Sequence, residues 1–435
     1  MNNLAGSLKL RLSTGLAAQG YNQAVTIGTQ LVSVPILIAA WGVERYGVWL
    51  LISAIPAYLA LADLGFAQVG GGEMTMRLAR GDRDGAVTSY QTTFAMNCVL
   101  GLVCFAVVAG FALSPLSRAL IGEAHATWEV QWAIVALAAH VLMTLLRGVI
   151  GAGLRSAGQF SVLVALAATM RLTDTAIVLT VAILGGGILD AATGMLAGAA
   201  AGMLAVTLWF QRRHPWLKLG FWHASRASAR EMLPSSLHFV GYTLGNLISI
   251  QGATIVVGAV LGPAAVALTS TARTLARVGA TAANMISHTL QIEYAALFGS
   301  GATRPFRRLI RWHALAIGAM ATLYLVLMLA FGPLVYGAWT HGKLGTPHLL
   351  LSLLAIATFG EMLWTALQTP SIAVNRLRIT GRVFFVASCL GLLALGLLSR
   401  EFSVIVFGWV AVALSTGMLM AAAFEFRILT RALRE

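Results

Sequence analysis

Long apolar segments of about 20 residues alternate with short polar segments along this 435-residue chain. An α-helix of about 20 apolar residues crosses the roughly 30 Å of hydrocarbon in a bilayer, whereas the strands of a membrane barrel alternate over about ten residues. A helix also satisfies its own backbone hydrogen bonds in lipid. The pattern therefore predicts an all-α integral membrane protein with about twelve transmembrane helices. The segments lie at approximately 15–40, 47–70, 86–113, 130–151, 161–184, 189–210, 235–258, 264–290, 312–334, 347–370, 379–398 and 403–424.

Polar side chains recur at helical spacing inside five of these segments. Polar groups that face lipid are costly, and coherent stripes on five helices exceed what ordinary hydrogen bonding between packed helices needs. We therefore expect the stripes to face a central polar cavity. They comprise Gln19, Asn22, Gln23, Thr26, Gln30 and Ser33 in the first segment, His140, Thr144 and Arg147 in the fourth, Ser235, His238, Tyr242, Asn246 and Ser249 in the seventh, Arg273, Arg277, Asn284 and His288 in the eighth, and Glu361, Thr365 and Gln368 in the tenth.

The pattern repeats after about 220 residues, since Gly42 matches Gly262 and Gly81 matches Gly301. Many transporters consist of repeated bundles, with the substrate site near the midplane at the repeat interface. The repeat predicts two six-helix bundles around the polar cavity. We place the N-terminal bundle at 1–211, a cytoplasmic linker at 212–230 and the C-terminal bundle at 231–435.

The linker is basic and carries interleaved aromatic residues, including Trp216, Phe221 and Trp222. This composition predicts an interfacial helix or linker that lies on the inner leaflet. A docking site for a specific partner is the alternative.

Composition and charge set the location and the orientation. The chain is 58% hydrophobic and 10% charged, which is far from the roughly 25% charged residues of soluble domains. With the N-terminus in the cytoplasm, 22 of the 29 Lys and Arg residues fall on the cytoplasmic side and four on the outer side. The positive-inside rule then predicts that both termini are cytoplasmic. The net charge of +14 is scattered over short segments, which indicates contact with anionic lipid headgroups and no nucleic-acid partner.

Two arginines in the eighth segment are the leading candidates for substrate binding. Arg273 and Arg277 stand one helical turn apart, and no acidic residue of the same segment lies three or four positions away. Guanidinium groups bind phosphate bidentately, so the pair predicts a phosphate or diphosphate ligand. Pairing with Asp63, Glu293 or Glu361 on other helices is the alternative. The predicted substrate-binding residues are Arg273, Arg277, Asn284, His288, Gln23, Gln30, Tyr242, Asn246 and Arg147.

Three intramembrane carboxylates are candidates for coupling transport to a cation, either Na⁺ or H⁺. Glu361 is the best placed, within the polar stripe of the tenth segment. Asp63 lies near the inner end of the second segment, where it serves equally well as a helix-end residue. Asp174 follows Arg171 by three positions, and the spacing predicts that these two residues pair with each other.

The sequence contains no complete enzyme motif. Residues 337–344 imitate a phosphate-binding loop, but Leu344 replaces the required Ser or Thr and no strand precedes the loop. Cys98, Cys104 and Cys389 lie within apolar segments without metal-ligand spacing. We therefore expect no catalytic residue, no metal site and no cofactor.

Short motifs occur in both halves of the chain. They are Gly42, Tyr46, Gly47 and Trp49, then Asp63-Leu64-Gly65, then Gly81-Asp82, and in the second half Gly262, Arg273 to Leu275, and Tyr336, Gly337 and Trp339. With these motifs, residues 35–82 and the second half resemble the polysaccharide transporters of the multidrug/oligosaccharidyl-lipid/polysaccharide (MOP) superfamily, and the Wzx-type O-antigen flippases in particular. Two features depart from related proteins: the proline that usually closes the eighth helix is absent, and twelve segments differ from the fourteen of lipid II flippases.

The resemblance implies a function as well as a fold. It implies two six-helix bundles that move a lipid-linked oligosaccharide, carried on polyprenyl diphosphate, from the cytoplasmic to the periplasmic leaflet of a bacterial inner membrane by alternating access. Such a flippase serves the synthesis of lipopolysaccharide or another surface polysaccharide, beside a polysaccharide polymerase and its chain-length machinery. Two alternatives stay open: an ion-coupled multidrug or small-molecule antiporter of the same fold, and a membrane glycan polymerase or ligase, which generally needs a larger outer loop than any here.

Overall fold

The structure is a computed structural model, and the residues it describes form helices without any strand. It describes the backbone of residues 2–59, 66–123, 125, 127–299, 302–373 and 379–432. Within these ranges the description leaves out the side chains of residues 2–13, 16, 66, 68, 76, 79, 234–243, 288, 289, 292, 293, 295, 296, 299 and 430–432. The prediction of an all-α membrane fold is confirmed.

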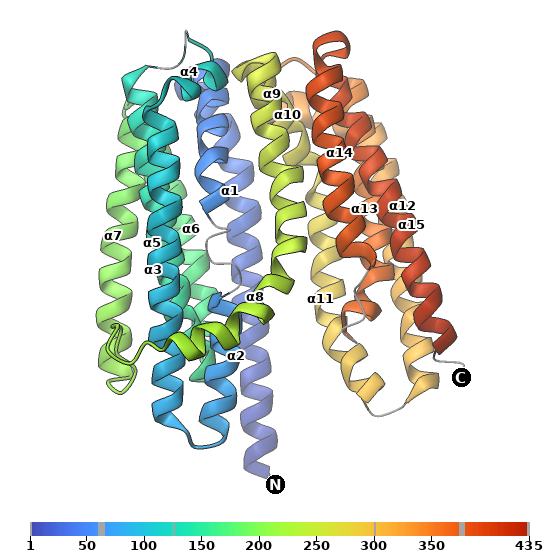
Figure 1. Cartoon of the computed structure of the whole chain (residues 1–435). Helices are drawn as coiled ribbons and strands as arrows, with labels where there is room; N and C mark the ends of the chain where they lie inside the picture. Colours follow the sequence, from blue (N-terminus) through green and yellow to red (C-terminus); the bar gives the residue numbers. More distant parts are fainter. Residues whose placement is uncertain are drawn as a thin grey trace. The chain divides into compact units, whose positions relative to one another are not determined.

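The chain divides into two compact units (Figure 1). Unit 1 comprises Met1–Arg45 and Ile52–Val240, and unit 2 comprises Tyr46–Leu51 and Gly241–Glu435. Helices from α1 to the first part of α8 build unit 1: α1 (Asn2–Ala57), α2 (Phe66–Ala79), α3 (Arg83–Leu113), α4 (Pro115–Ile121), α5 (Trp128–Ser156), α6 (Phe160–Ile183), α7 (Ile188–Arg213) and α8 (Arg226–Leu247). The rest build unit 2: the π-helical turn η2 (Ile248–Gly252), α9 (Ala253–Leu261), α10 (Pro263–Ala276), α11 (Val278–Gly299), α12 (Thr303–Trp339), α13 (His348–Ala373), α14 (Ile379–Phe402) and α15 (Ile405–Ala432).

Each unit has its own packing. In unit 1, α5 packs against α2, α3 and α7, and the core there gathers buried side chains such as Tyr90, Leu154 and Phe210. In unit 2, α13 packs against α11, α12 and α15, and its Met362 and Trp364 belong to two buried clusters. The central helix is thus α5 in unit 1 and α13 in unit 2, and these two helices occupy equivalent places in the repeat.

The element bounds confirm the predicted repeat. Helix α3 begins at Arg83 and α12 at Thr303, 220 residues later, and α5 and α13 begin at Trp128 and His348 with the same offset. Gly42 has φ 76° and ψ 171°, and Gly262 has φ 84° and ψ 174°. This positive φ favours glycine, because other residues meet a steric penalty there. Each glycine therefore turns the chain between two consecutive membrane helices of its repeat.

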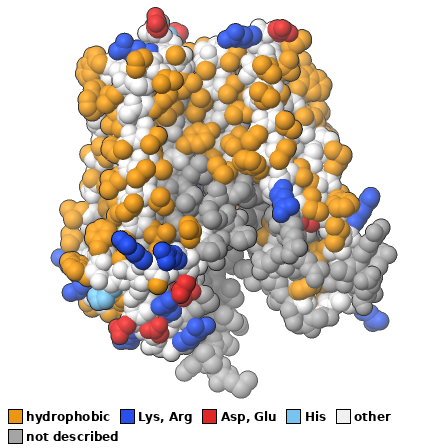
Figure 2. All heavy atoms as spheres, in the orientation of Figure 1, with side chains coloured by type: hydrophobic (Ala, Val, Ile, Leu, Met, Phe, Trp, Pro, Cys, Tyr) orange, Lys and Arg blue, Asp and Glu red, His pale blue; other side chains and the backbone are white. Residues whose placement is uncertain are grey.

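The twelve predicted segments correspond to ten long apolar helices in the described part of the chain. The second segment, 47–70, is divided between the end of α1 and α2, and Asp63 in it lies outside the described residues. The eighth, 264–290, divides at Arg277 into α10 and α11. Figure 2 shows hydrophobic side chains covering the long helices of unit 1, with charged side chains at the two ends. This distribution is the one expected of helices that span a bilayer.

A short stretch of α1 belongs to unit 2. Gly47 approaches the start of α10 so closely that a Cβ atom at this position would lie 1.9 Å from the carbonyl oxygen of Pro263. In the same stretch of α1, Trp49 is buried, and the side chain of Leu51 packs against Gly258. Glycine is therefore required at residue 47 by the close approach of two backbones.

Candidate functional site

A cavity of about 320 Å³ lies within unit 2 and receives polar side chains from seven helical segments, α8, η2, α10, α11, α13, α14 and α15. This volume falls in the range of pockets that hold small ligands, which is about 300–1,000 Å³. The polar residues on its wall are Asn246, Ser249, Arg273, Arg277, Asn284, Ser287, Gln291, Thr358, Glu361, Thr365, Gln368, Thr369, Ser388 and Ser415.

A π-helical turn forms one part of the wall. In a π-helix the backbone pairing is shifted, which frees carbonyl groups for other donors, and such turns are frequent at functional sites. Here the carbonyl oxygen of Ile250 accepts hydrogen bonds from the Nη1 of Arg273 at 3.1 Å and from the hydroxyl of Thr254 at 2.9 Å. Arg273 therefore holds the turn in place.

Arg273 is largely committed to neutral partners. Besides Ile250, its Nη2 donates to the hydroxyl of Thr254 at 3.3 Å, and its guanidinium lies 5.7 Å from the ring centre of Phe407. No carboxylate of the described residues forms an ion pair with Arg273, so its positive charge still acts on the cavity.

Arg277 is paired with an acidic residue of another helix. Its Nη2 lies 2.8 Å from the Oε1 of Glu361, and the two side chains are 40% and 20% exposed. The expectation of two unpaired arginines was therefore wrong for Arg277, and the alternative of pairing with Glu361 is confirmed. Glu361, a candidate for cation coupling, is thus a partner of the substrate-binding candidate.

The charge of the described wall is positive. Its charged side chains are the two arginines and Glu361, so one positive charge remains after the Arg277 pair is counted. Amide and hydroxyl groups make up the rest of the polar wall. Such a wall can bind an anionic group at the arginines and a neutral polar group, such as a sugar, along the amides and hydroxyls.

The structure brings together only some of the predicted substrate-binding residues. Asn246 and Asn284 share the wall with Arg273 and Arg277, and Thr365 and Gln368 of the predicted stripe lie there too. The side chains of Tyr242 and His288 lie outside the described residues. The others, Gln23, Gln30 and Arg147, belong to unit 1, and their role in substrate binding stays a prediction.

Unit 1 has a polar cluster of its own. The Nε2 of His140 lies 3.1 Å from the Oδ2 of Asp174, and Arg147 donates to the hydroxyl of Thr144 at 3.0 Å. The predicted pairing of Asp174 with Arg171 was wrong. Arg171 instead donates to the hydroxyl of Thr26 on α1. The reason is that packing turns two neighbouring residues of α6 towards different helices, α5 and α1.

The sequence did not predict that α14 and α15 contribute polar side chains to the cavity wall. Ser388 on α14 and Ser415 on α15 lie on the wall, yet both belong to segments that are otherwise mostly apolar. Gly360 explains the close approach of α15, since a Cβ atom there would lie 2.9 Å from the hydroxyl of Ser415. One available signal was this small residue in the tenth segment, which allows two membrane helices to approach closely.

Comparisons with known proteins agree with this architecture. Residues 44–296 match the family described as "Polysaccharide biosynthesis protein". No curated protein matches the sequence.

Solved structures of transporters have a similar fold. An inward-facing multidrug resistance MATE family transporter of the MOP superfamily has a TM-score of 0.70 and 17% identity, with 98% of each chain covered. An outward-facing conformation of such a transporter has a TM-score of 0.59 and 17% identity, with 98% of this chain and 95% of that chain covered. A MOP superfamily transporter from Pyrococcus furiosus, whose binding pocket is described as of reverse polarity, has a TM-score of 0.59 and 16% identity, with the same coverage. The fold is that of MOP-superfamily transporters.

Proposed function

We propose, since the chain belongs to the polysaccharide biosynthesis protein family, that it is a flippase for a lipid-linked oligosaccharide. It moves a polyprenyl-diphosphate-linked sugar from the cytoplasmic to the periplasmic leaflet of a bacterial inner membrane, without chemical change to the substrate. The two units reorient so that the binding site opens first to one leaflet and then to the other. The product is available on the outer face to a polysaccharide polymerase.

The observation that carries the proposal is the positively charged, polar cavity of unit 2. Arg277 presents a guanidinium that is 40% exposed, which leaves donors for a phosphate oxygen beside its bond to Glu361. The amides of Asn284, Gln291 and Gln368 supply both donors and acceptors, which suit sugar hydroxyls. The polyprenyl tail stays in lipid, so the cavity needs to hold only the polar headgroup.

The charge of the cavity also favours this function over that of a multidrug antiporter. A multidrug antiporter of the same fold binds organic cations, which favour acidic walls. The described wall has two arginines against one carboxylate, and that carboxylate is already paired. An anionic substrate is therefore favoured over a cationic one.

The test uses the full chain in proteoliposomes. The probe is a polyprenyl-diphosphate disaccharide with a nitrobenzoxadiazole label on the sugar, and dithionite added outside bleaches the label that remains in the outer leaflet. We expect the wild-type protein to exchange the probe between leaflets faster than protein-free liposomes. Arg277→Ala slows exchange about tenfold, the rate equivalent of one charge-assisted hydrogen bond of about 1.4 kcal/mol. Arg277→Lys restores part of the rate, because lysine keeps the charge but loses the forked geometry.

Arg400→Ala is the matched control, because Arg400 lies in the last turn of α14, away from the cavity wall, and should leave the rate unchanged. Wild-type protein that moves the probe no faster than empty liposomes overturns the proposed function. Full exchange by Arg277→Ala overturns the role of the cavity.

A further inference from the structure

We propose that the segment after α7 anchors unit 1 to anionic phospholipid headgroups at the membrane surface. This linker segment, residues 214–225, carries exposed aromatic side chains between basic residues and connects α7 to α8 as turns. This anchor does not depend on the identity of the transported substrate.

Two large aromatic side chains of the linker segment stand out from the protein. Trp222 is 85% exposed and Phe221 is 58% exposed. The ring of Phe221 rests on that of Phe94 with 5.3 Å between centres, and a Cβ atom at Gly220 would lie 2.5 Å from the ring of Trp222. Each ring thus contacts the protein on one side, and the rest of its surface is exposed. Tryptophan in such a position is typical of the membrane–water interface, where one end of the ring is apolar and the other is wet.

The linker segment is held in place although it forms no helix. The side chain of Gln91, only 2% exposed, donates from Nε2 to the carbonyl oxygen of Lys218 at 3.1 Å. The backbone N–H of His223 donates to the Oε1 of Gln91 at 2.7 Å, and the backbone N–H of Ser225 donates to the hydroxyl of Thr92 at 3.0 Å. A buried amide that bonds on both sides of Trp222 fixes the backbone from which this ring projects.

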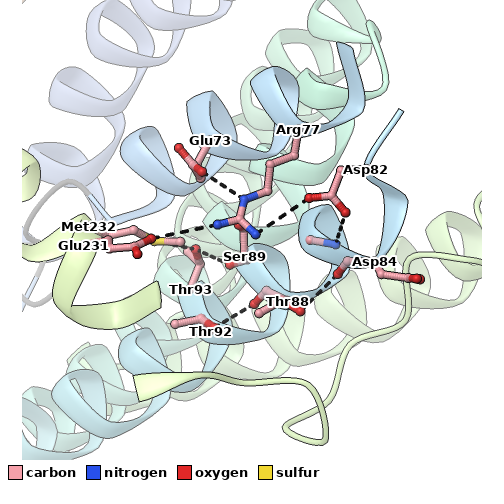
Figure 3. A network of polar contacts seen from close by, with 11 residues as sticks. Glu73, Arg77, Asp82, Asp84, Thr88, Ser89, Thr92, Thr93, Glu231 and Met232 are labelled. Atoms are coloured by element: carbon pink, nitrogen blue, oxygen red, sulfur yellow. Dashed lines mark hydrogen bonds and ion pairs between the residues drawn. The ribbon is translucent and has the colours of Figure 1, made fainter. Parts of the chain in front are cut away.

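Arg77 extends the attachment to the start of α8 (Figure 3). Its guanidinium points between Glu73 at 2.9 Å, Glu231 at 3.9 Å and Asp82 at 4.0 Å. Asp82 also caps α3, where its side chain accepts from the backbone N–H of Gly85 at 2.8 Å. The α2–α3 turn, the linker segment and the first turns of α8 therefore form one connected platform.

Helix lengths place this platform at the membrane boundary. About 20 residues of helix cross the hydrocarbon. Counted back from Leu113 at the end of α3, about 20 residues end near Phe94, which contacts the linker segment. Counted from Ile188 at the start of α7, about 20 residues end near Leu208, shortly before Arg212. Two helices thus put the linker segment at the same interface.

The charge around the aromatic rings selects the lipid. The stretch 212–230 contains five basic residues and no acidic residue. These basic side chains are all exposed: Arg212, Arg213, Lys218, Arg226 and Arg230. Each basic residue near an anionic membrane surface contributes about 1 kcal/mol, or about a fivefold gain in binding. An anionic phospholipid surface therefore matches both the rings and the charge.

The test follows the depth of the linker segment in nanodiscs that contain the full chain and no other integral protein. The label is bimane on His223→Cys, beside Trp222, in a background where Cys98, Cys104 and Cys389 are alanine. The quencher is a phospholipid brominated near its headgroup. We expect strong quenching in discs that contain phosphatidylglycerol and about fivefold weaker quenching in discs of phosphatidylcholine alone.

Two variants separate charge from attachment. Arg212→Gln, Arg213→Gln and Lys218→Gln together remove three of the five exposed charges and should strongly reduce the dependence on phosphatidylglycerol while thermal unfolding stays unchanged. Gln91→Ala releases the backbone and should weaken quenching, whereas the matched Gln131→Ala, at a buried glutamine of α5 that bonds to Ser117, should not. Quenching that is absent in both lipids, as expected of a surface for a protein partner, overturns the proposal. Equal quenching in both lipids, with or without the three charges, overturns its anionic part.

Discussion

The Nη2 of Arg277 and the Oε1 of Glu361 lie 2.8 Å apart on the wall of the unit 2 cavity, although 84 residues separate them in the chain. Glu361 is therefore paired with a guanidinium that is 40% exposed and so accessible to an incoming anion. Under the proposed function, a diphosphate that binds at Arg277 shares or displaces this contact, and the carboxylate repels its charge. Glu361 is thus, under the proposed function, an internal competitor of the anionic substrate.

Removal of that competitor should strengthen anion binding. We expect Glu361→Gln to raise the affinity for a soluble polyprenyl diphosphate analogue about fivefold, because a half-exposed ion pair contributes at most about 1 kcal/mol. Isothermal titration of the purified protein in detergent measures the effect. Gln368→Glu, on the same face of α13, is the opposite control and should weaken binding. Weaker binding by Glu361→Gln would mean that the carboxylate positions Arg277 for its ligand.

Arg273 should matter for stability more than Arg277 does. Arg273→Gln loses the hydrogen bonds to Ile250 and Thr254 and the contact with Phe407, which together contribute about 1–3 kcal/mol to the free energy of unfolding. Thermal unfolding in detergent should show a lower midpoint for this variant. Arg400→Gln is the comparison, at an exposed arginine in the last turn of α14. An unchanged midpoint for Arg273→Gln would show that the π-helical turn holds without its arginine.

Gly47 should tolerate no side chain. Gly47→Ala places a Cβ atom 1.9 Å from the carbonyl oxygen of Pro263, and backbone on both sides prevents an easy adjustment. We expect a loss of about 2 kcal/mol or more in stability and reduced accumulation in membranes. The matched control is Gly318→Ala within α12, where a Cβ atom meets nothing within 4 Å. Equal midpoints for the two variants would contradict the close approach of residue 47 to α10.

The orientation of the chain in the membrane is open to a direct test. The charge bias of 22 to four predicts that residue 300 faces the cytoplasm and residue 342 the periplasm. Fusions of alkaline phosphatase and of green fluorescent protein after Ser300 and after Gly342 should give opposite signals. The same signal from both positions would refute the orientation with cytoplasmic termini.

Helical periodicity made much of the fold predictable. A long apolar stretch satisfies its own backbone in lipid, so its length alone indicates a spanning helix, whatever its neighbours are. The same local logic identified the face of the eighth segment with Arg273 and Arg277 and the face of α13 with Glu361 and Gln368, which do lie on one cavity. The positive φ of Gly42 and Gly262 likewise agrees with the repeat that their spacing indicated.

Contacts between helices were the part that the sequence left open. Spacing along a helix determines which residues share a face, but the rotation and the neighbours of that helix follow from packing in the bundle. For this reason Asp174 meets His140 rather than Arg171, and the cavity gains Ser388 and Ser415 from helices with little polar signal.

The sequence by itself determined the position of ten of the twelve predicted spanning segments, their repeat and the charged residues available to them, because these follow from local composition and the thickness of the bilayer. Only the tertiary structure decided which charges neutralise one another. It also decided that residues 214–225 form turns held by Gln91, 127 residues before Lys218 in the chain, where the sequence left an interfacial helix and a linker equally open. Partner choice depends on which side chains packing brings within hydrogen-bond distance, and no spacing along one segment contains that information.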